Sequence, residues 1–274
     1  MKLDLEMGRD GVAPKDAATV VLVRDVDAGL EVFIVERSKQ SRFMGGAIVF
    51  PGGKVDPGDA DPSWAPLVSD EVNAHAIAAC RETLEEACML HVAGGTVDHD
   101  QLAALRTRLT TDAGALRSFL GERGLKLDLA ALHPLSRWIT PTAEARRFDA
   151  RFFAAVAPPG QPGAHDSHET MASFWASPAE VLRRWEAGEV QMAPPTHATI
   201  ALLATCMTTA EVLAAAVAGT LEPICPRLVP QGDTLALALP GDPEHDVRES
   251  RLKVPDATRY VMRDSRWLPE HAPR

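Results

Sequence analysis

Two stretches decide what this chain folds into: Phe50-Pro51-Gly52-Gly53-Lys54 and, further along, Arg81-Glu82-Thr83-Leu84-Glu85-Glu86. In a helix with about 100° per residue, Glu82, Glu85 and Glu86 fall within a sector of roughly 100°. The apolar residues of the same segment fall on the opposite side: Ile77, Cys80, Leu84, Ala87 and Cys88. The pattern therefore predicts a helix with one face in a core and one face of concentrated negative charge.

This acidic face has two interpretations. It could be a solvated surface, although like charges three and four positions apart destabilise a helix by a few tenths of a kcal/mol. It could instead hold a hard divalent cation, because Mg²⁺ and Mn²⁺ prefer oxygen ligands. The adjacent Gly52 and Gly53 follow an apolar strand and permit a close approach to a ligand, which favours the metal site.

Together the two stretches resemble the Nudix box, G-x5-E-x7-R-E-U-x-E-E-x-G-U, in which U is a bulky aliphatic residue. The matching positions are the opening glycine, the charged core and the last apolar position: Gly53, Arg81, Glu82, Glu85, Glu86 and Met89. The resemblance implies a Nudix hydrolase, an enzyme that cleaves a diphosphate linked to a second moiety.

The chain departs from this pattern at four points. Asp59 stands where the family has glutamate, and 21 residues instead of seven separate it from Arg81. Thr83 occupies an aliphatic position, and Cys88 replaces a glycine. We expect the helix not to need a positive φ at Cys88. None of the departures removes a carboxylate of the cluster.

More of the chain is similar to one Nudix branch, the peroxisomal coenzyme A diphosphatases of animals, which also carry an insert inside the box. The similar segments are residues 41–53, 137–141, 147–153 and 192–195, and the resemblance covers roughly residues 17–205. It implies the Nudix α/β/α sandwich, an α/β fold with a mixed β-sheet. We expect a loose leader at 1–16, the Nudix domain at 17–219 with inserted helices at about 99–124, and a C-terminal extension at 220–274.

The resemblance also implies site residues. Glu82, Glu85 and Glu86 are expected to bind Mg²⁺ or Mn²⁺, and a backbone carbonyl at Gly52 is a candidate further ligand. Arg81 is expected to pair with a carboxylate of the cluster and fix its rotamer, rather than touch phosphate. Gly53 is expected to lie against the substrate.

Three further residues are candidates outside the box. Glu169 matches a glutamate of the resembling branch and is the candidate for a further metal ligand or the general base. Arg42 and Arg147 are candidates for binding substrate phosphates, because arginine makes bidentate contacts with phosphate. The alternative for all three is a solvated surface side chain.

The function that we expect is metal-dependent hydrolysis of coenzyme A or acyl-CoA to 3′,5′-ADP and 4′-phosphopantetheine or its acyl form. The box builds the metal site and not the pocket, so ADP-ribose, NADH or another nucleoside diphosphate derivative is an open alternative. A third hypothesis is a ligand-sensing domain without catalysis. The presence of all three core glutamates argues against it.

Bulk properties narrow the partners. The 274 residues carry 38 acidic against 28 basic side chains, and this net charge of −10 argues against general nucleic-acid binding. The four cysteines show no zinc-ligand spacing, and the first ten residues hold no apolar signal segment, so we expect free thiols and a cytoplasmic protein. Residues 198–218 contain Glu211 and read as two buried helices rather than a membrane span. A homodimer is left open.

Local signals place the other elements. A hairpin is expected from residues 19–24 and 30–37, and a short strand at 47–50. An ordered loop is expected at 60–69, with Ser69 as the N-cap of a helix that runs to about Leu90. Further strands are expected at 135–140, 147–156, 172–176, 234–239 and 259–262. Ser177 and Pro178 open another helix.

Overall fold

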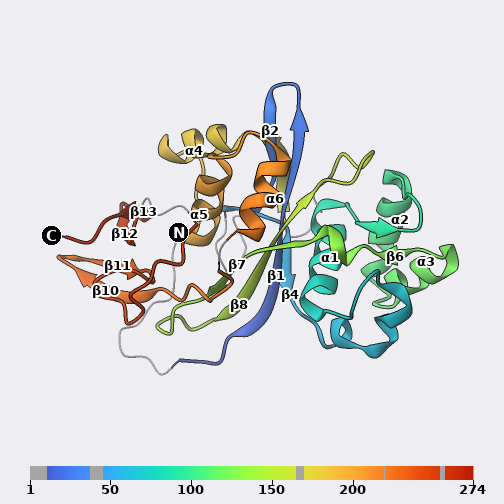
Figure 1. Ribbon diagram of the computed structural model, residues 1–274, viewed down its shortest axis with the longest axis horizontal. Helices are drawn as coiled ribbons and strands as arrows, with labels where there is room; N and C mark the ends of the chain where they lie inside the picture. Colours follow the sequence, from blue (N-terminus) through green and yellow to red (C-terminus); the bar gives the residue numbers. More distant parts are fainter. Residues whose placement is uncertain (1–10, 38–45, 165–169, 219, 254–256, 274) are drawn as a thin grey trace.

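A mixed β-sheet forms the centre of the computed structural model, which describes residues 11–37, 46–164, 170–218, 220–253 and 257–273 (Figure 1). Seven strands of this sheet lie within the described residues. They are β1 (Lys15–Val26), β2 (Gly29–Arg37), β3 (Ile48–Val49), β4 (Gly52–Lys54), β7 (His133–Ile139), β8 (Phe148–Val156) and β9 (Thr170–Ala176).

The strand order is β3-β2-β1-β8-β7, with β4 paired to β1 and β9 paired to β2. β1 and β8 run parallel, from Lys15 opposite Phe148 to Val23 opposite Val156, and the remaining pairs are antiparallel. Residues 20–23 of β1 are completely buried because helices cover both faces of the sheet here. The expected β1–β2 hairpin and the mixed sheet are confirmed.

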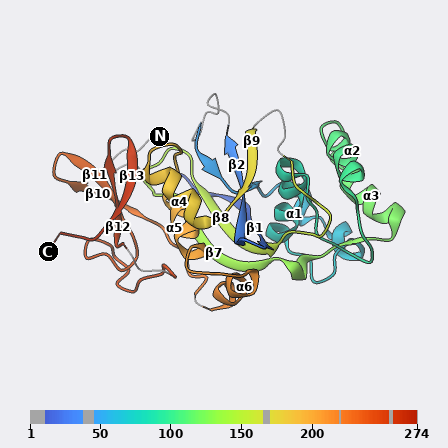
Figure 2. The same ribbon diagram turned by 90° about the horizontal axis from the view of Figure 1, so that it is seen from above.

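Helices lie on both sides of the sheet, as Figures 1 and 2 show. One side has α1 (Ala74–Ala87), α2 (His99–Leu109) and α3 (Ala115–Arg123), and the other has α4 (Pro178–Glu186), α5 (Pro194–Leu203) and α6 (Thr209–Val217). The helices α2 and α3 lie beyond α1 at one end of the molecule. Each face has its own cluster of buried apolar side chains. The α/β/α sandwich is thus confirmed, as is Ser177 as the cap of α4.

Helix α1 begins four residues later than the sequence predicts. Its N-cap is Asn73, whose side-chain oxygen accepts hydrogen bonds from the backbone N–H groups of His75 and Ala76 at 3.1 and 3.2 Å. The hydroxyl of Ser69 is used elsewhere, since it accepts a hydrogen bond from the backbone N–H of Leu129 at 3.0 Å. The prediction of Ser69 as the cap is therefore wrong.

Helix α1 ends at Ala87 rather than at about Leu90, because Cys88 turns into the left-handed region with φ of 53°. The N–H of Cys88 donates to the carbonyl of Leu84 at 3.0 Å and closes the last turn. The expectation that this position needs no positive φ is wrong. The Nudix box has glycine at this position, and a glycine has no Cβ atom that disfavours a positive φ. Cys88 adopts the same left-handed conformation in spite of its Cβ atom.

The insert inside the box, for which the sequence predicts an ordered loop at 60–69, contains two short 3₁₀ helices, Pro57–Ala60 and Pro62–Leu67. Trp64 is 4% exposed, and its indole N–H donates to the carbonyl of Gly58 at 2.9 Å. The segment between α1 and β7 contains α2 and α3, which are the inserted helices expected at about 99–124. It also contains the strands β5 (Val92–Ala93) and β6 (Lys126–Leu127) and a 3₁₀ turn at Leu129–Ala131.

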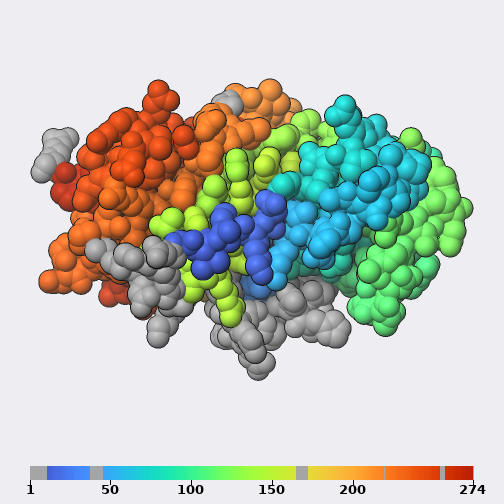
Figure 3. All heavy atoms as spheres, turned by 90° about the horizontal axis from the view of Figure 1, so that it is seen from below, coloured from blue at the N-terminus to red at the C-terminus, as the bar shows by residue number. Residues whose placement is uncertain are grey.

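Residues 220–273 include a second, four-stranded antiparallel sheet: β10 (Arg227–Gln231), β11 (Thr234–Ala238), β12 (Arg259–Arg263) and β13 (Arg266–Glu270). Leu237, Tyr260 and Trp267 of this sheet belong to the same buried cluster as α4, α5 and α6. Figure 3 shows this sheet at one end of the molecule, with α2 and α3 at the other. The C-terminal extension is therefore packed against the sandwich.

Within the described residues, no helix has both the length and the apolar composition that a bilayer crossing requires.

Candidate active site

The Gly-Gly turn brings β4 against both β1 and the acidic face of α1. A Cβ atom on Gly52 would lie 2.5 Å from the carbonyl oxygen of Ala18 and 2.7 Å from the Cα of Thr19. A Cβ atom on Gly53 would lie 2.4 Å from the carboxyl carbon of Glu82. Neither glycine has a positive φ. They are needed here because other atoms approach closely, and not because of an unusual backbone conformation.

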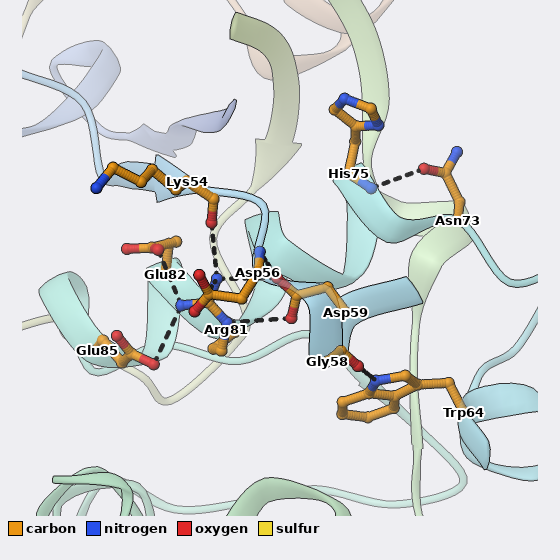
Figure 4. A network of polar contacts seen from close by, with 10 residues as sticks. All are labelled: Lys54, Asp56, Gly58, Asp59, Trp64, Asn73, His75, Arg81, Glu82 and Glu85. Atoms are coloured by element: carbon orange, nitrogen blue, oxygen red, sulfur yellow. Dashed lines mark hydrogen bonds and ion pairs between the residues drawn. The ribbon is translucent and has the colours of Figure 1, made fainter. Parts of the chain in front are cut away.

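Arg81 holds two carboxylates of the cluster, as Figure 4 shows. Its Nη1 donates to Glu82 Oε1 at 2.8 Å and to Glu85 Oε1 at 3.4 Å. Its Nη2 donates to the carbonyl oxygen of Lys54 at 2.8 Å, which ties α1 to the turn after β4. The contacts agree with the expectation that Arg81 fixes carboxylates.

Asp59 completes the arrangement around Arg81. Its side chain is 4% exposed, and its two oxygens accept from Arg81 Nε and Nη2 at 3.1 and 3.0 Å. Asp59 Oδ2 also accepts from the backbone N–H of Asp56 at 2.8 Å. The shorter side chain at the position of the family glutamate therefore binds Arg81 rather than facing solvent.

The three core glutamates differ in environment. Glu86 is 6% exposed and accepts a hydrogen bond from the backbone N–H of Gly52 at 2.9 Å. Burial raises the pKa of Glu82 to about 7, and burial also raises the pKa of Glu85. Four carboxylates of the described residues lie within ion-pair distance of the Arg81 guanidinium: Asp56, Asp59, Glu82 and Glu85. The acidic face is therefore a buried charged cluster rather than a solvated surface.

A cavity of about 970 Å³ opens in front of this cluster. Its floor contains Ala17 and Thr19 of β1 beside Ala150 and Phe152 of β8, which lie at paired positions in register. Its walls come from the ends of several elements. They include the turn at 52–54, Arg37 of β2, and Val49 and Phe50. The other lining residues are Arg106, Thr107, Leu109 and Thr110 at the end of α2 and Ala193, Pro195 and Thr196 at the start of α5. The cavity thus has a charged side and an apolar side.

The structure brings most of the expected site residues to this one cavity. Six of them line it: Gly52, Gly53, Arg81, Glu82, Glu85 and Glu86. Arg42 and Glu169 lie outside the described residues, and both remain predictions.

Arg147 is not brought to the cavity. Its Nε donates to the carbonyl of Thr140 at 3.0 Å, and its Nη1 donates to the carbonyl of Val12 at 2.7 Å. Its neighbour Phe148 lines the cavity instead. The guanidinium ties the start of β1 to the turn before β8.

Sequence reasoning missed a basic residue of the cavity, Arg37. Its Nε is buried and has no hydrogen-bond partner in the part of the chain that the structure describes. Arg37 is the last residue of β2, a strand that runs toward the Gly-Gly turn. This position at the end of the strand could have indicated that its side chain lies near the site. Arg106 was missed as well, because nothing local shows which face of α2 meets the cavity; its Nη1 donates to the carbonyl of Ala164 at 2.9 Å.

The donor set fits a divalent cation. Glu82, Glu85 and Glu86 supply only oxygen atoms, and Gly53 leaves the space in which the Glu82 carboxylate lies against the backbone. No group of three or more His, Cys, Asp or Glu side chains among the described residues is gathered as a metal would require. Arg81 instead separates Glu82 from Glu85, while Glu86 is bonded to Gly52. These three glutamates are the residues that would hold the ion.

Comparison with protein families gives a match over residues 68–203 to the NUDT19 Nudix domain. The acyl-coenzyme A diphosphatase NUDT19 of Gallus gallus is 27% identical over an alignment 221 residues long, and the match covers 60% of this chain and 58% of that protein. The chain thus spans less than two thirds of the length of that relative. The protein of the same name from Homo sapiens is 24% identical over an alignment 298 residues long, and the match covers 87% of this chain and 79% of that protein.

A solved structure agrees with these matches. The crystal structure of a Nudix hydrolase from Alicyclobacillus acidocaldarius is 32% identical, with a TM-score of 0.65, and the match covers 74% of this chain and 96% of that chain. The likeness therefore extends over nearly all of a solved Nudix hydrolase. The chain belongs to the Nudix hydrolase family.

Proposed function

We propose that this protein hydrolyses the diphosphate linkage of coenzyme A or acyl-CoA with the help of Mg²⁺ or Mn²⁺. The products are 3′,5′-ADP and 4′-phosphopantetheine or its acyl form. The observation that carries the proposal is the cavity of about 970 Å³, in which the Nudix-box carboxylates lie beside basic and apolar side chains. The similarity to two acyl-coenzyme A diphosphatases supports the choice of a CoA substrate.

In this proposal the carboxylates hold the metal. A bound divalent cation neutralises phosphate oxygens and lowers the pKa of a bound water molecule. Glu82, Glu85 and Glu86 supply the oxygen ligands, and Arg81 keeps Glu82 and Glu85 at the cavity wall. Glu169 stays the proposed general base or further ligand.

The substrate is held by other side chains of the cavity. Arg37, with its buried and unpartnered Nε among the described residues, replaces Arg147 as the proposed phosphate contact. A guanidinium binds phosphate oxygens by charge-assisted hydrogen bonds. Phe148, Phe152 and Leu109 give the cavity an apolar part, which suits an adenine ring or the alkyl part of pantetheine.

A substrate panel tests the proposal. CoA, an acyl-CoA, ADP-ribose and NADH are incubated with Mg²⁺ or Mn²⁺, and the products are separated by chromatography. We expect the highest kcat/KM for CoA or the acyl-CoA, and we expect Glu85→Gln to abolish turnover of all four. Turnover of ADP-ribose or NADH without turnover of CoA would contradict the substrate while leaving diphosphate hydrolysis intact.

A further inference from the structure

We propose that the first turn of α5 is a phosphate-binding subsite of the cavity, in which the hydroxyl and the backbone N–H of Thr196 donate to a phosphate oxygen. The inference rests on the proposed function in one respect, that the substrate carries nucleotide phosphates. It does not require that the substrate be CoA.

The side chain of Thr196 is the first observation. Thr196 is 5% exposed and lines the cavity. Across the described residues, its hydroxyl has no hydrogen-bond partner, whereas the hydroxyl of Thr199, one turn later, donates to the carbonyl of Pro195 at 2.8 Å. The hydroxyl oxygen is not among the buried polar atoms that lack a partner in the described residues, so it is accessible from the cavity. A ligand that enters the cavity can supply the missing partner.

The helix end is the second observation. The N-cap of α5 is Ala193, which has no side-chain oxygen to cap the helix. The next two residues, Pro194 and Pro195, have no N–H, and the N–H of His197 donates to the carbonyl of Ala193 at 2.9 Å. This leaves the N–H of Thr196 as the open donor of the first turn in the described structure. No acidic residue lies in that turn, so the positive end of the helix dipole is not neutralised.

The C-terminal sheet holds this turn in place. His197 lies between Trp185 of α4 and Tyr260 of β12, with ring centroids 4.4 and 5.6 Å away. Its Nδ1 lies 3.0 Å from the hydroxyl oxygen of Tyr260. All three side chains are buried. Because burial lowers the pKa of His197 to about 4, the ring is neutral at pH 7, and the attraction for an anion comes from Thr196 and the helix end.

The test compares the wild-type protein with Thr196→Val, which keeps the shape of the side chain and removes the hydroxyl. Binding of 3′,5′-ADP, 3′-AMP, 5′-AMP and adenosine is measured by calorimetry in EDTA, so that no metal contributes. We expect about tenfold weaker binding of 3′,5′-ADP, the change for losing one hydrogen bond to a charged group. Adenosine, which has no phosphate, should bind equally to both proteins. Whichever monophosphate loses affinity identifies the phosphate that occupies the subsite.

Two variants serve as controls. Thr196→Ser restores the hydroxyl and should restore binding, and Thr199→Val removes a hydroxyl that already has a partner and should leave binding unchanged. Thr196→Val should melt close to the temperature of the wild type, because the hydroxyl that it removes makes no hydrogen bond to the described residues. A purely structural role of Thr196 would instead lower the melting temperature and weaken adenosine as well.

Three results would overturn the subsite. They are equal affinity of wild type and Thr196→Val for 3′,5′-ADP, a loss in Thr199→Val as large as in Thr196→Val, and a wild type that binds neither 3′,5′-ADP nor inorganic pyrophosphate. If Thr196→Val weakens the phosphate probes while CoA is not hydrolysed, the subsite stands and the proposed substrate fails.

Discussion

Replacing Gly53 with alanine tests how closely the Glu82 carboxylate must lie to the backbone. The new methyl group would lie 2.4 Å from the carboxyl carbon and from Oε1 of Glu82, and 2.5 Å from Oε2. Ordinary contact requires a separation about 1 Å longer, so the carboxylate has to retreat by about 1 Å. A misplacement of this size in a catalytic site can cost about 100-fold in rate. We therefore expect kcat/KM of Gly53→Ala to fall about 100-fold.

The fold should survive this substitution. Gly53 has no positive φ, and the atoms in the way belong to the end of a flexible side chain. Two other glycines supply controls. Gly58→Ala meets no atom within 4 Å and should leave both activity and melting unchanged. Gly52→Ala meets backbone atoms of Ala18 and Thr19 and should lower the free energy of unfolding by about 1–3 kcal/mol, the usual cost of overpacking.

Activity is measured with CoA over a range of Mg²⁺ concentrations, and stability is measured by circular dichroism melts. Near-wild-type kcat/KM in Gly53→Ala, with an unchanged melting temperature, would refute the claim that Glu82 must lie where the structure places it. Loss of activity together with loss of folding would show that the strand pairing, and not the carboxylate, was disturbed.

Three further outcomes are expected. Glu85→Gln and Glu86→Gln should each lower kcat at least about 100-fold while the circular dichroism melts stay close to wild type; retained kcat at saturating Mg²⁺ would remove that residue from the metal ligands. Arg37→Ala should raise KM for CoA about tenfold or more with little change in kcat, whereas exposed Arg108→Ala should change neither; an unchanged KM in Arg37→Ala would exclude the phosphate contact. In EDTA the melting temperature should fall as the pH rises from about 5 to 8, because the raised pKa of Glu82 makes the folded state bind a proton that the unfolded state has already released. Glu82→Gln should flatten this fall and Mg²⁺ should offset it, so parallel pH profiles for wild type and Glu82→Gln would contradict the pKa shift.

The sequence predicted the elements whose signals are local. The acidic face of α1, the β1–β2 hairpin and the cap of α4 follow from periodicity and from neighbouring residues. The start of α1 was misjudged because Ser69 looks like a cap on its own. Its hydroxyl bonds instead to the backbone of Leu129, 60 positions away, which no local pattern shows.

Prolines concealed two strands of the C-terminal sheet. β10 contains Pro230 and β13 contains Pro269, and a proline within an apolar run argues against a central strand. Both are edge strands in the observed order β10-β11-β12-β13, where a missing N–H costs little. The rule holds, but the sequence alone does not show which strands lie at the edge.

The composition of the cavity could be predicted only in part. The box residues come from two segments with recognisable spacing, so their convergence was expected. Arg37, Arg106 and Thr196 come from the ends of three elements that meet only in the folded chain. Thr196 directly follows the segment at 192–195 that drew attention as a motif, but its unpartnered hydroxyl becomes visible only when its burial is known.

The most direct test of the central claim is the ³¹P NMR spectrum of CoA during incubation with the protein and Mg²⁺. We predict that the diphosphate resonances disappear and that two new phosphomonoester resonances appear beside that of the 3′-phosphate. One comes from the 5′-phosphate of 3′,5′-ADP and the other from 4′-phosphopantetheine. An intact diphosphate signal under conditions in which the same sample consumes ADP-ribose, or the release of inorganic phosphate from the 3′ position alone, would contradict it.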